Sequence, residues 1–192
     1  MGSEMCIRDR HYPDINPADY SDIVGYFPLS TKNDVDEAIQ AAHIAFKSWS
    51  HMLPAERAKY LEKFAQLLDQ EKERIGEALC REEGKTIKEA IGEPSRGAVE
   101  TSFFIGEGQR LEGITMPSDR KGVVSVATRV PIGVVAAISP WNFPFLTPVR
   151  KVIPALVFGN TVVFKPASDT PYCAVLLMEL FEKAGLPPGV VN

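Results

Sequence analysis

Cysteine is scarce in this sequence. The 192 residues include only Cys6, Cys80 and Cys173. An odd number of widely spaced cysteines fits neither a disulfide framework nor a paired-cysteine metal site. The sequence therefore predicts no metal centre and favours a reducing, cytoplasmic setting.

Long apolar runs are also missing. The most apolar stretch spans residues 132–138, between Pro131 and Pro140, and it is far shorter than the roughly 18 apolar residues that a membrane span needs. The first residues lack the continuous apolar region and the small-residue cleavage site of a secretory signal. We therefore expect no membrane partner and no secretion.

No segment carries charge of one sign only. The chain has 21 basic and 25 acidic residues, a net charge of −4, and no cluster of Lys and Arg without interleaved Asp or Glu. Such a surface offers no footprint for a phosphate backbone, so nucleic acid is not an expected partner. A composition of 45% hydrophobic and 24% charged residues is typical of a globular domain, or of one domain plus part of a second.

The first dozen residues do not look like part of a fold. The run MCIRDR, from Met5 to Arg10, resembles the translation of a transposase adaptor used in DNA sequencing, a known contaminant of assembled reading frames. We therefore predict that residues 1–12 are a non-native leader and that the fold begins at residue 13.

Residues 13–121 are predicted to be mainly helical. After a short strand within 21–29, apolar residues recur at helical spacing, first as Val35, Ile39, Ala42 and Phe46 and later as Ala58, Leu61, Ala65 and Leu68. Helix-start and helix-stop residues set the limits. The helices are expected to begin at Thr31 or Asn33 and end near Trp49, to begin at Pro54, to span 71–83 before Gly84, and to run from Thr86 to about Arg110.

From residue 122 the apolar period changes. Alternating residues predict a strand over 122–131, preceded by a polar linker over 113–122. The apolar runs 133–138 and 161–164 follow as buried strands, each with a helix after it, over 146–158 and 169–184. That order predicts parallel strands and an α/β fold, in which the helical N-terminal half leads into a truncated, doubly wound, Rossmann-like domain over 132–192. A third apolar strand is expected to begin at Val190.

Two unusual loops follow the two parallel strands, where open sheets bind ligands. In the first, Ser139 to Phe145, Asn142 lies between Pro140 and Pro144 and can donate two N–H groups to an oxyanion. Its alternative role is to close an Asx-turn. In the second loop, Lys165 can reach ribose hydroxyls or a phosphate, and Ser168 can donate to an anion or simply cap the next helix.

These segments resemble the NAD(P)-dependent aldehyde dehydrogenase superfamily. The resemblance rests on PIGVVAAISPWNFPF from Pro131, PAL at Pro154, GNTVVFKPAS from Gly159, GLPPGVVN from Gly185 and the EEGKT stretch at Glu82. It covers most of the chain after the first dozen residues. It implies a cysteine thiolate that attacks an aldehyde, an asparagine that holds the oxyanion, hydride transfer to nicotinamide, and a glutamate that activates water.

By this resemblance Asn142 is the catalytic oxyanion donor. The expected cofactor-binding residues are Ile138, Ser139, Pro140, Trp141, Asn142, Lys165, Pro166, Ala167 and Ser168. NAD-preferring relatives often have a glutamate at the position of Ser168, where its charge would repel a 2′-phosphate. The serine predicts that NADP is at least accepted beside NAD.

The same resemblance predicts that the chain is an N-terminal fragment. Cys80 and Cys173 fall within predicted helices and Cys6 within the leader, so the nucleophile and the catalytic glutamate are expected beyond Asn192. The fragment is then inactive alone. The alternative is a short, non-catalytic dinucleotide-binding or subunit-interaction module. The expected substrate is a small-molecule aldehyde, nearest to a dicarboxylic semialdehyde, and the strand at 122–131 predicts a homo-oligomer of the full-length protein.

Overall fold

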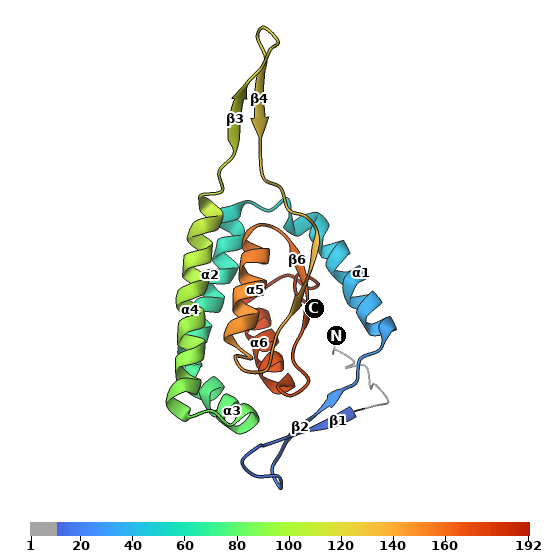
Figure 1. Ribbon diagram of the computed structural model, residues 1–192, viewed down its shortest axis with the longest axis vertical. Coiled ribbons are helices and arrows are strands. Elements are labelled where there is room, and N and C mark those ends of the chain that lie inside the picture. The colour runs from blue at the N-terminus through green and yellow to red at the C-terminus, as the bar shows by residue number, and fades with distance from the viewer. Residues whose placement is uncertain (1–10) are drawn as a thin grey trace.

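The computed structural model describes residues 11–192, which form a layer of long helices beside a small parallel α/β unit, with one hairpin projecting from the body (Figure 1). In chain order the elements are β1 (His11–Ile15), β2 (Ile23–Pro28), α1 (Lys32–Trp49), α2 (Pro54–Gln70), α3 (Lys72–Glu83), α4 (Ile87–Gln109), β3 (Ile114–Pro117), β4 (Val124–Ala127), β5 (Val134–Ile138), α5 (Leu146–Val157), β6 (Thr161–Lys165) and α6 (Pro171–Ala184).

The described residues begin with a two-stranded antiparallel sheet. The predicted strand within 21–29 is present as β2, and β1 pairs with it, with Tyr12 opposite Phe27. His11 and Tyr12 were assigned to the predicted leader, yet they are part of β1. The rest of that leader, residues 1–10, lies outside the described residues.

The helical half matches the prediction in its helix limits. Thr31 precedes α1, and the Asp34 carboxylate accepts hydrogen bonds from the Thr31 N–H at 2.6 Å and the Thr31 hydroxyl at 2.9 Å. The stripe on α2 is buried as predicted. The prediction of an apolar stripe on α1 was wrong for the first half of the helix, because Val35 and Ile39 are exposed. Only the C-terminal half of α1 packs on the α/β unit, through Ala42, Ala45 and Trp49.

The prediction of a polar linker over 113–122 was wrong, because this segment contains the strand β3. β3 pairs with β4 in antiparallel register from Ile114 opposite Ala127 to Pro117 opposite Val124. The predicted strand over 122–131 is shorter, since β4 ends at Ala127. The resulting hairpin stands away from the rest of the body (Figure 1), and β3 is exposed along its whole length.

The α/β unit confirms the predicted fold class. β5 and β6 are parallel, in register from Val134 opposite Thr161 to Ile138 opposite Lys165, and α5 connects them. On the other side of β6, Val191 forms a parallel bridge with Val162. This bridge lies one residue after the predicted start of a third strand at Val190, and it extends the sheet in the direction from β5 to β6, as in one half of a doubly wound sheet.

One core joins the helical layer to the α/β unit. Phe64 of α2 stacks on Phe181 of α6, with ring centroids 4.2 Å apart and planes 9° apart. The Trp49 indole donates to the carbonyl of Leu156 at 3.2 Å, and the buried Arg57 donates through Nε to the carbonyl of Val157 at 3.1 Å. Each fully buried side chain of this size stabilises the fold by about 1.5–3 kcal/mol. The two layers therefore fold around shared contacts.

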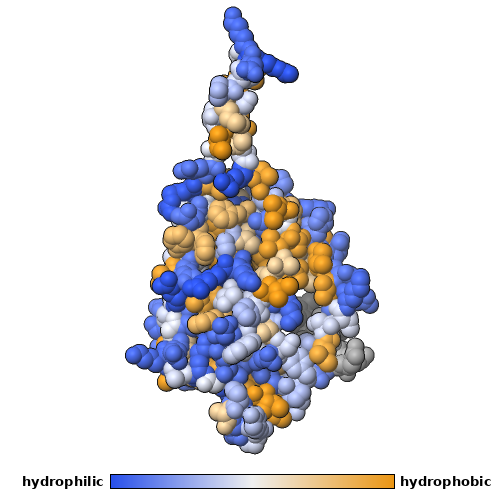
Figure 2. All heavy atoms as spheres, in the orientation of Figure 1, coloured by the Kyte–Doolittle hydropathy of each residue, from blue (hydrophilic) through white to orange (hydrophobic). Residues whose placement is uncertain are grey.

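Part of the surface remains apolar. Figure 2 shows hydrophobic side chains gathered on the upper right of the body, beside the base of the hairpin. Val130 and Ile132, which lead from the hairpin into β5, are 73% and 87% exposed. Contiguous exposed apolar surface is typical of contacts with further polypeptide. Among residues 11–192 no helix is long and apolar enough to cross a membrane.

Candidate active site

The two predicted ligand loops lie side by side. Ile138 and Lys165, the last residues of β5 and β6, are opposite each other in the parallel register. The next residue, Ser139, donates its backbone N–H to the carbonyl of Lys165 at 3.2 Å. Both loops therefore leave the sheet at the same edge, which is the edge where open parallel sheets bind their ligands.

The side chains at this edge differ in exposure. Ile138 and Trp141 are 62% and 55% exposed, and Lys165 and Ser168 are exposed too. Ser139 is buried, and its hydroxyl has no hydrogen-bond partner among the described residues. An ammonium group, two hydroxyls and an open indole suit the phosphates, ribose and rings of a dinucleotide. The residues present therefore fit such a cofactor.

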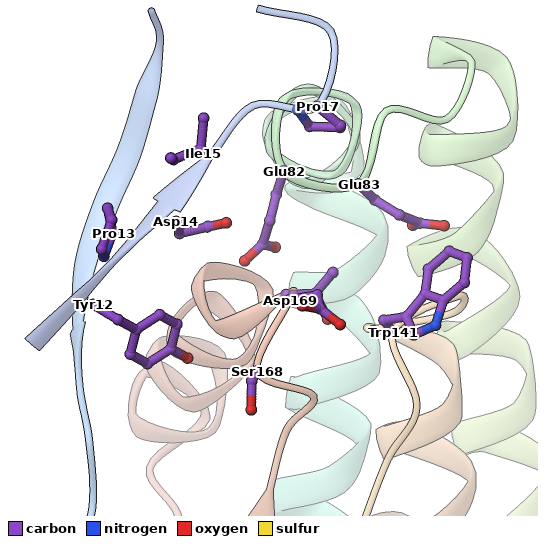
Figure 3. A pocket seen from close by; sticks show the side chains of 11 residues that line it. Tyr12, Pro13, Asp14, Ile15, Pro17, Glu82, Glu83, Trp141, Ser168 and Asp169 are labelled. Carbon is purple, nitrogen blue, oxygen red and sulfur yellow. The ribbon is translucent and has the colours of Figure 1, made fainter. Parts of the chain in front are cut away.

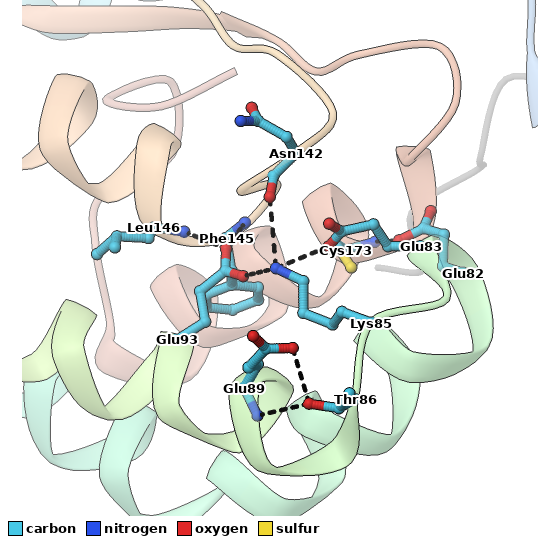
Figure 4. A network of polar contacts seen from close by, with 10 residues as sticks. All are labelled: Glu82, Glu83, Lys85, Thr86, Glu89, Glu93, Asn142, Phe145, Leu146 and Cys173. Atoms are coloured by element: carbon cyan, nitrogen blue, oxygen red, sulfur yellow. Dashed lines mark hydrogen bonds and ion pairs between the residues drawn. The ribbon is translucent and has the colours of Figure 1, made fainter.

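Asn142 is exposed at the tip of the first loop. Its side chain makes no hydrogen bond within residues 11–192, so the Asx-turn that was the alternative role is not formed. Its backbone carbonyl accepts from Lys85 Nζ at 3.4 Å. Figure 4 shows the side-chain amide on the far side of the loop from that lysine. Both amide N–H groups are thus available to a ligand.

Ser168 does not cap the helix that follows it. α6 begins at Pro171, with Thr170 before it, so the predicted start at residue 169 was wrong. A carboxylate from another helix caps α6 instead, because Glu82 accepts from the backbone N–H of Tyr172 at 2.5 Å and of Cys173 at 2.9 Å. The Ser168 hydroxyl is therefore left for other partners.

A pocket of about 530 Å³ connects the two loops (Figure 3). Trp141 lines it from the first loop and Ser168 from the second, and β1 and the end of α3 form the opposite wall. Glu82 and Asp14 both lie on this wall, with their carboxyl groups pointing toward one another (Figure 3). Burial raises the pKa of Glu82 to about 8 and also raises the pKa of Asp14. Near neutral pH this wall is therefore less negative than its carboxyl groups suggest.

Neither described cysteine has the character of a nucleophile. Burial raises the pKa of the Cys80 thiol. Burial among carboxylates raises the pKa of Cys173 well above its usual range. Since the thiolate is the reactive form, both side chains stay protonated at neutral pH. Cys6 lies outside the described residues.

The structure adds residues that the sequence analysis did not single out. Glu93 of α4 accepts hydrogen bonds through one carboxylate oxygen from the backbone N–H groups of Phe145 and Leu146, at 2.8 Å each. Its other oxygen pairs with Lys85 Nζ at 2.6 Å. A signal for Glu93 was present, because it follows Ala90 by three residues on the buried face of α4. A carboxylate on a buried helical face requires partners.

A parallel β-α-β unit with paired ligand loops at the carboxyl ends of its strands defines a Rossmann-like dinucleotide-binding domain. The sequence of nearly the whole chain, including those two loops, assigns this dinucleotide-binding domain to one family. The sequence profile of the aldehyde dehydrogenase family matches residues 7–192. The chain belongs to that family.

The relatives that the chain matches are longer than the chain itself. It is 48% identical over 177 residues to alpha-ketoglutaric semialdehyde dehydrogenase of Bacillus subtilis (strain 168), covering 92% of this chain and 36% of that enzyme. The structure of an NADP-dependent enzyme from E. coli superposes with a TM-score of 0.92 at 38% identity, covering 95% of this chain and 38% of the other.

A second solved structure contains a bound cofactor. NADP-dependent glyceraldehyde-3-phosphate dehydrogenase from Bacillus halodurans C-125, complexed with NADP, superposes with a TM-score of 0.90 at 38% identity, over 95% of this chain and 39% of the other. The chain thus spans less than two fifths of the length of these proteins.

Proposed function

We propose that this chain is the N-terminal part of an enzyme that oxidises an aldehyde to its carboxylic acid with NAD(P)⁺. The observation that carries the proposal is the exposed Asn142 amide, which lies next to the loop edge that suits a dinucleotide. In the complete enzyme a cysteine thiolate from beyond this chain attacks the aldehyde and forms a thiohemiacetal. The isolated 192-residue chain has no dehydrogenase activity.

Asn142 holds the oxyanion of that thiohemiacetal. Pro140 and Pro144 restrict the backbone on both sides of it, so the amide does not need to be ordered during the reaction. Preorganised donors of this kind contribute most where charge develops in the transition state. Loss of one such donor lowers kcat by about 10²–10³-fold.

The cofactor loops orient the dinucleotide, which accepts hydride when it is bound. Residues 138–141 line it, the Ser139 hydroxyl is free to donate to it, and Lys165 and Ser168 contact the adenosine ribose. Ser168 carries no negative charge, so a 2′-phosphate is tolerated and NADP is accepted beside NAD. Asp169, the next residue, also lines the pocket, so Lys165 must supply the compensating positive charge.

The substrate we favour is a semialdehyde with a carboxylate at its other end. Support comes from the Bacillus subtilis relatives, since a malonate-semialdehyde dehydrogenase is also 41% identical over 96% of this chain.

The hairpin β3–β4 supports a homo-oligomer. It stands away from the body (Figure 1) and exposes Ile114, Val124 and Val126 to between 62% and 68%. Isolated two-stranded hairpins are marginally stable in water. A second copy of the full-length protein provides the surface that covers this one.

The test is an assay of the full-length enzyme for aldehyde-dependent formation of NADPH and NADH. We expect activity in the parent, a 10²–10³-fold lower kcat for Asn142→Ala, and none in the isolated chain. A fully folded, full-length parent without aldehyde-dependent activity supports the alternative, a non-catalytic dinucleotide-binding or subunit-interaction module. Activity of the purified 192-residue chain also contradicts the proposal.

A further inference from the structure

Three charged side chains form a cluster beneath the Asn142 loop, in which Glu93 is buried and Lys85 and Glu83 are partly buried. Lys85 Nζ pairs with Glu93 at 2.6 Å and with Glu83 at 2.9 Å, and the side chains are 11%, 1% and 8% exposed respectively. We call these residues the Lys85 cluster. Figure 4 shows it between the start of α4 and the loop that precedes α5.

The Lys85 cluster contacts the loop at successive residues. Lys85 Nζ lies 3.4 Å from the carbonyl oxygen of Asn142 and 4.6 Å from the centroid of the Phe143 ring. Glu93 accepts from the N–H groups of Phe145 and Leu146. One ion pair therefore holds both ends of the segment 142–146, and it does so through backbone atoms and a ring.

The arrangement separates the role of the backbone from that of the Asn142 side chain. Lys85 and Glu93 bind the inner side of the loop, whereas the Asn142 amide points to the opposite side (Figure 4). Since none of the cluster's contacts uses the amide, the cluster can fix the amide's position without occupying its donors. Placement to within about 0.5 Å is what preorganised donors need.

The positive charge of Lys85 and the negative charges of Glu83 and Glu93 stabilise each other. Burial by itself would lower the pKa of Lys85, but the contacts with Glu93 and Glu83 outweigh burial and raise it. Without the ammonium, the two carboxylates of Glu83 and Glu93 would be buried together without a counter-charge. Glu93 also has the N-terminus of α5 as a favourable partner. The ammonium group of Lys85 is therefore needed between the two glutamates to balance their negative charge.

We propose that Lys85 is a positioning residue for the reaction, which holds the Asn142 loop through Glu93 and the loop backbone so that the Asn142 amide faces the oxyanion. The inference rests on the proposed function of Asn142. It assigns to the stretch EEGKT, at the junction of α3 and α4, a role in catalysis that is exerted without contact with the substrate.

The first test is a double-mutant cycle in the full-length enzyme. We expect Lys85→Met, which keeps the aliphatic stem, to lower kcat about tenfold, with the KM for the cofactor changed less than twofold. In an Asn142→Ala background the same substitution should change kcat less than twofold, because Lys85 acts through Asn142. Equal losses in both backgrounds indicate a merely structural lysine and overturn the proposal.

Lys88→Met is the matched control, because Lys88 is exposed on the first turn of α4 and should leave kcat unchanged. Lys85→Arg keeps the charge and thus the fold, but it moves the donor atoms. It should give a smaller loss of kcat that also disappears in the Asn142→Ala background. A loss that persists there contradicts the proposal even when Lys85→Met does not fold.

The second measurement does not depend on activity. Hydrogen exchange of the full-length protein should show at least tenfold faster exchange of the Phe145 and Leu146 amides in Lys85→Met than in Lys88→Met. Unchanged exchange at these amides overturns the positioning role. A parent without dehydrogenase activity but with the expected exchange contradicts the proposed function and leaves the role of Lys85 in holding the loop intact.

Discussion

The carboxylate of Glu82 accepts a hydrogen bond from the backbone N–H of Cys173 at 2.9 Å, so a residue of α3 caps the first turn of α6. Glu93 does the same for α5 at Leu146. Helix caps usually come from the residue just before the helix. Here the helical layer supplies a side-chain carboxyl group to each helix of the α/β unit. At α5 the negative charge of Glu93, which pairs with Lys85, also opposes the positive end of the helix dipole.

The first prediction concerns pH. Because burial raises the pKa of Glu82 from 4.5 to about 8, the folded chain holds a proton that the unfolded chain loses above about pH 4.5. The contribution of this proton to stability is therefore fully present below that pH and is lost as the pH rises through about 8. We expect the free energy of unfolding in urea to decrease by on the order of 3 kcal/mol between pH 5 and pH 8.

Glu82→Gln should flatten this pH profile, because the amide oxygen still accepts hydrogen bonds and does not ionise. A residual slope from Asp14, whose pKa is also raised by burial, should remain. Glu77→Gln, at an exposed position of α3, is the control and should keep the parent's profile. An unchanged slope in Glu82→Gln would show that other groups cause the decrease.

The second prediction compares two changes at Glu93. Glu93→Ala leaves two backbone N–H groups without acceptors and removes a partner of Lys85, so it should lower the free energy of unfolding by about 3 kcal/mol or more. Glu93→Gln keeps an acceptor and should lower it by less. Urea unfolding measures both. Glu62→Ala, on the exposed face of α2, should be nearly neutral, and equal effects of all three would contradict the prediction.

The third prediction concerns cofactor choice. Ser168→Glu in the full-length enzyme puts a carboxylate at the pocket that both cofactor loops share, and we expect it to repel a 2′-phosphate. The ratio of kcat/KM for NADP to that for NAD should fall at least tenfold, which corresponds to about 1.4 kcal/mol. Ser168→Ala is the matched control for loss of the hydroxyl alone. An unchanged ratio in Ser168→Glu refutes the role of Ser168.

The fourth prediction concerns assembly. Val126 lies on β4 opposite Thr115 and is 62% exposed, so Val126→Glu should place a charge in the proposed subunit contact. The full-length protein should sediment as an oligomer at micromolar concentration, and the variant should sediment at lower mass. Lys121→Gln, near the hairpin turn, should not change the mass. A monomeric parent would show that the hairpin has no such role.

Much of the fold was predictable because it depends on local signals. Pro54 and Thr86 mark helix starts, Gly84 adopts the left-handed conformation (φ 84°) just after α3, and the apolar runs mark the two parallel strands. The same rules place the two ligand loops at one edge of the sheet. Their shared position follows from the parallel direction of the two strands alone, since the carboxyl ends of parallel strands lie at the same edge of a sheet.

The remaining features depend on contacts between distant residues. The strand β3 carries a proline, which weakens a strand signal, and only its pairing with β4 reveals it. The exposure of Val35 follows from the part of α1 that the α/β unit leaves uncovered. No periodicity within a helix contains that information. Capping by Ser168 stayed open as an alternative because the true cap, Glu82, lies far away in the sequence.

The long-range caps also bear on how the protein is made. Glu82 and Glu93 precede the residues whose amides they bind by between 52 and 91 positions in the sequence. Because synthesis runs from the N-terminus at about 5–20 residues per second, these carboxylates leave the ribosome several seconds ahead of the helices that need them. The carboxyl groups that cap α5 and α6 are therefore synthesised before either helix. A nascent α5 or α6 that does not pack against α3 and α4 leaves the N–H groups of its first turn without these acceptors.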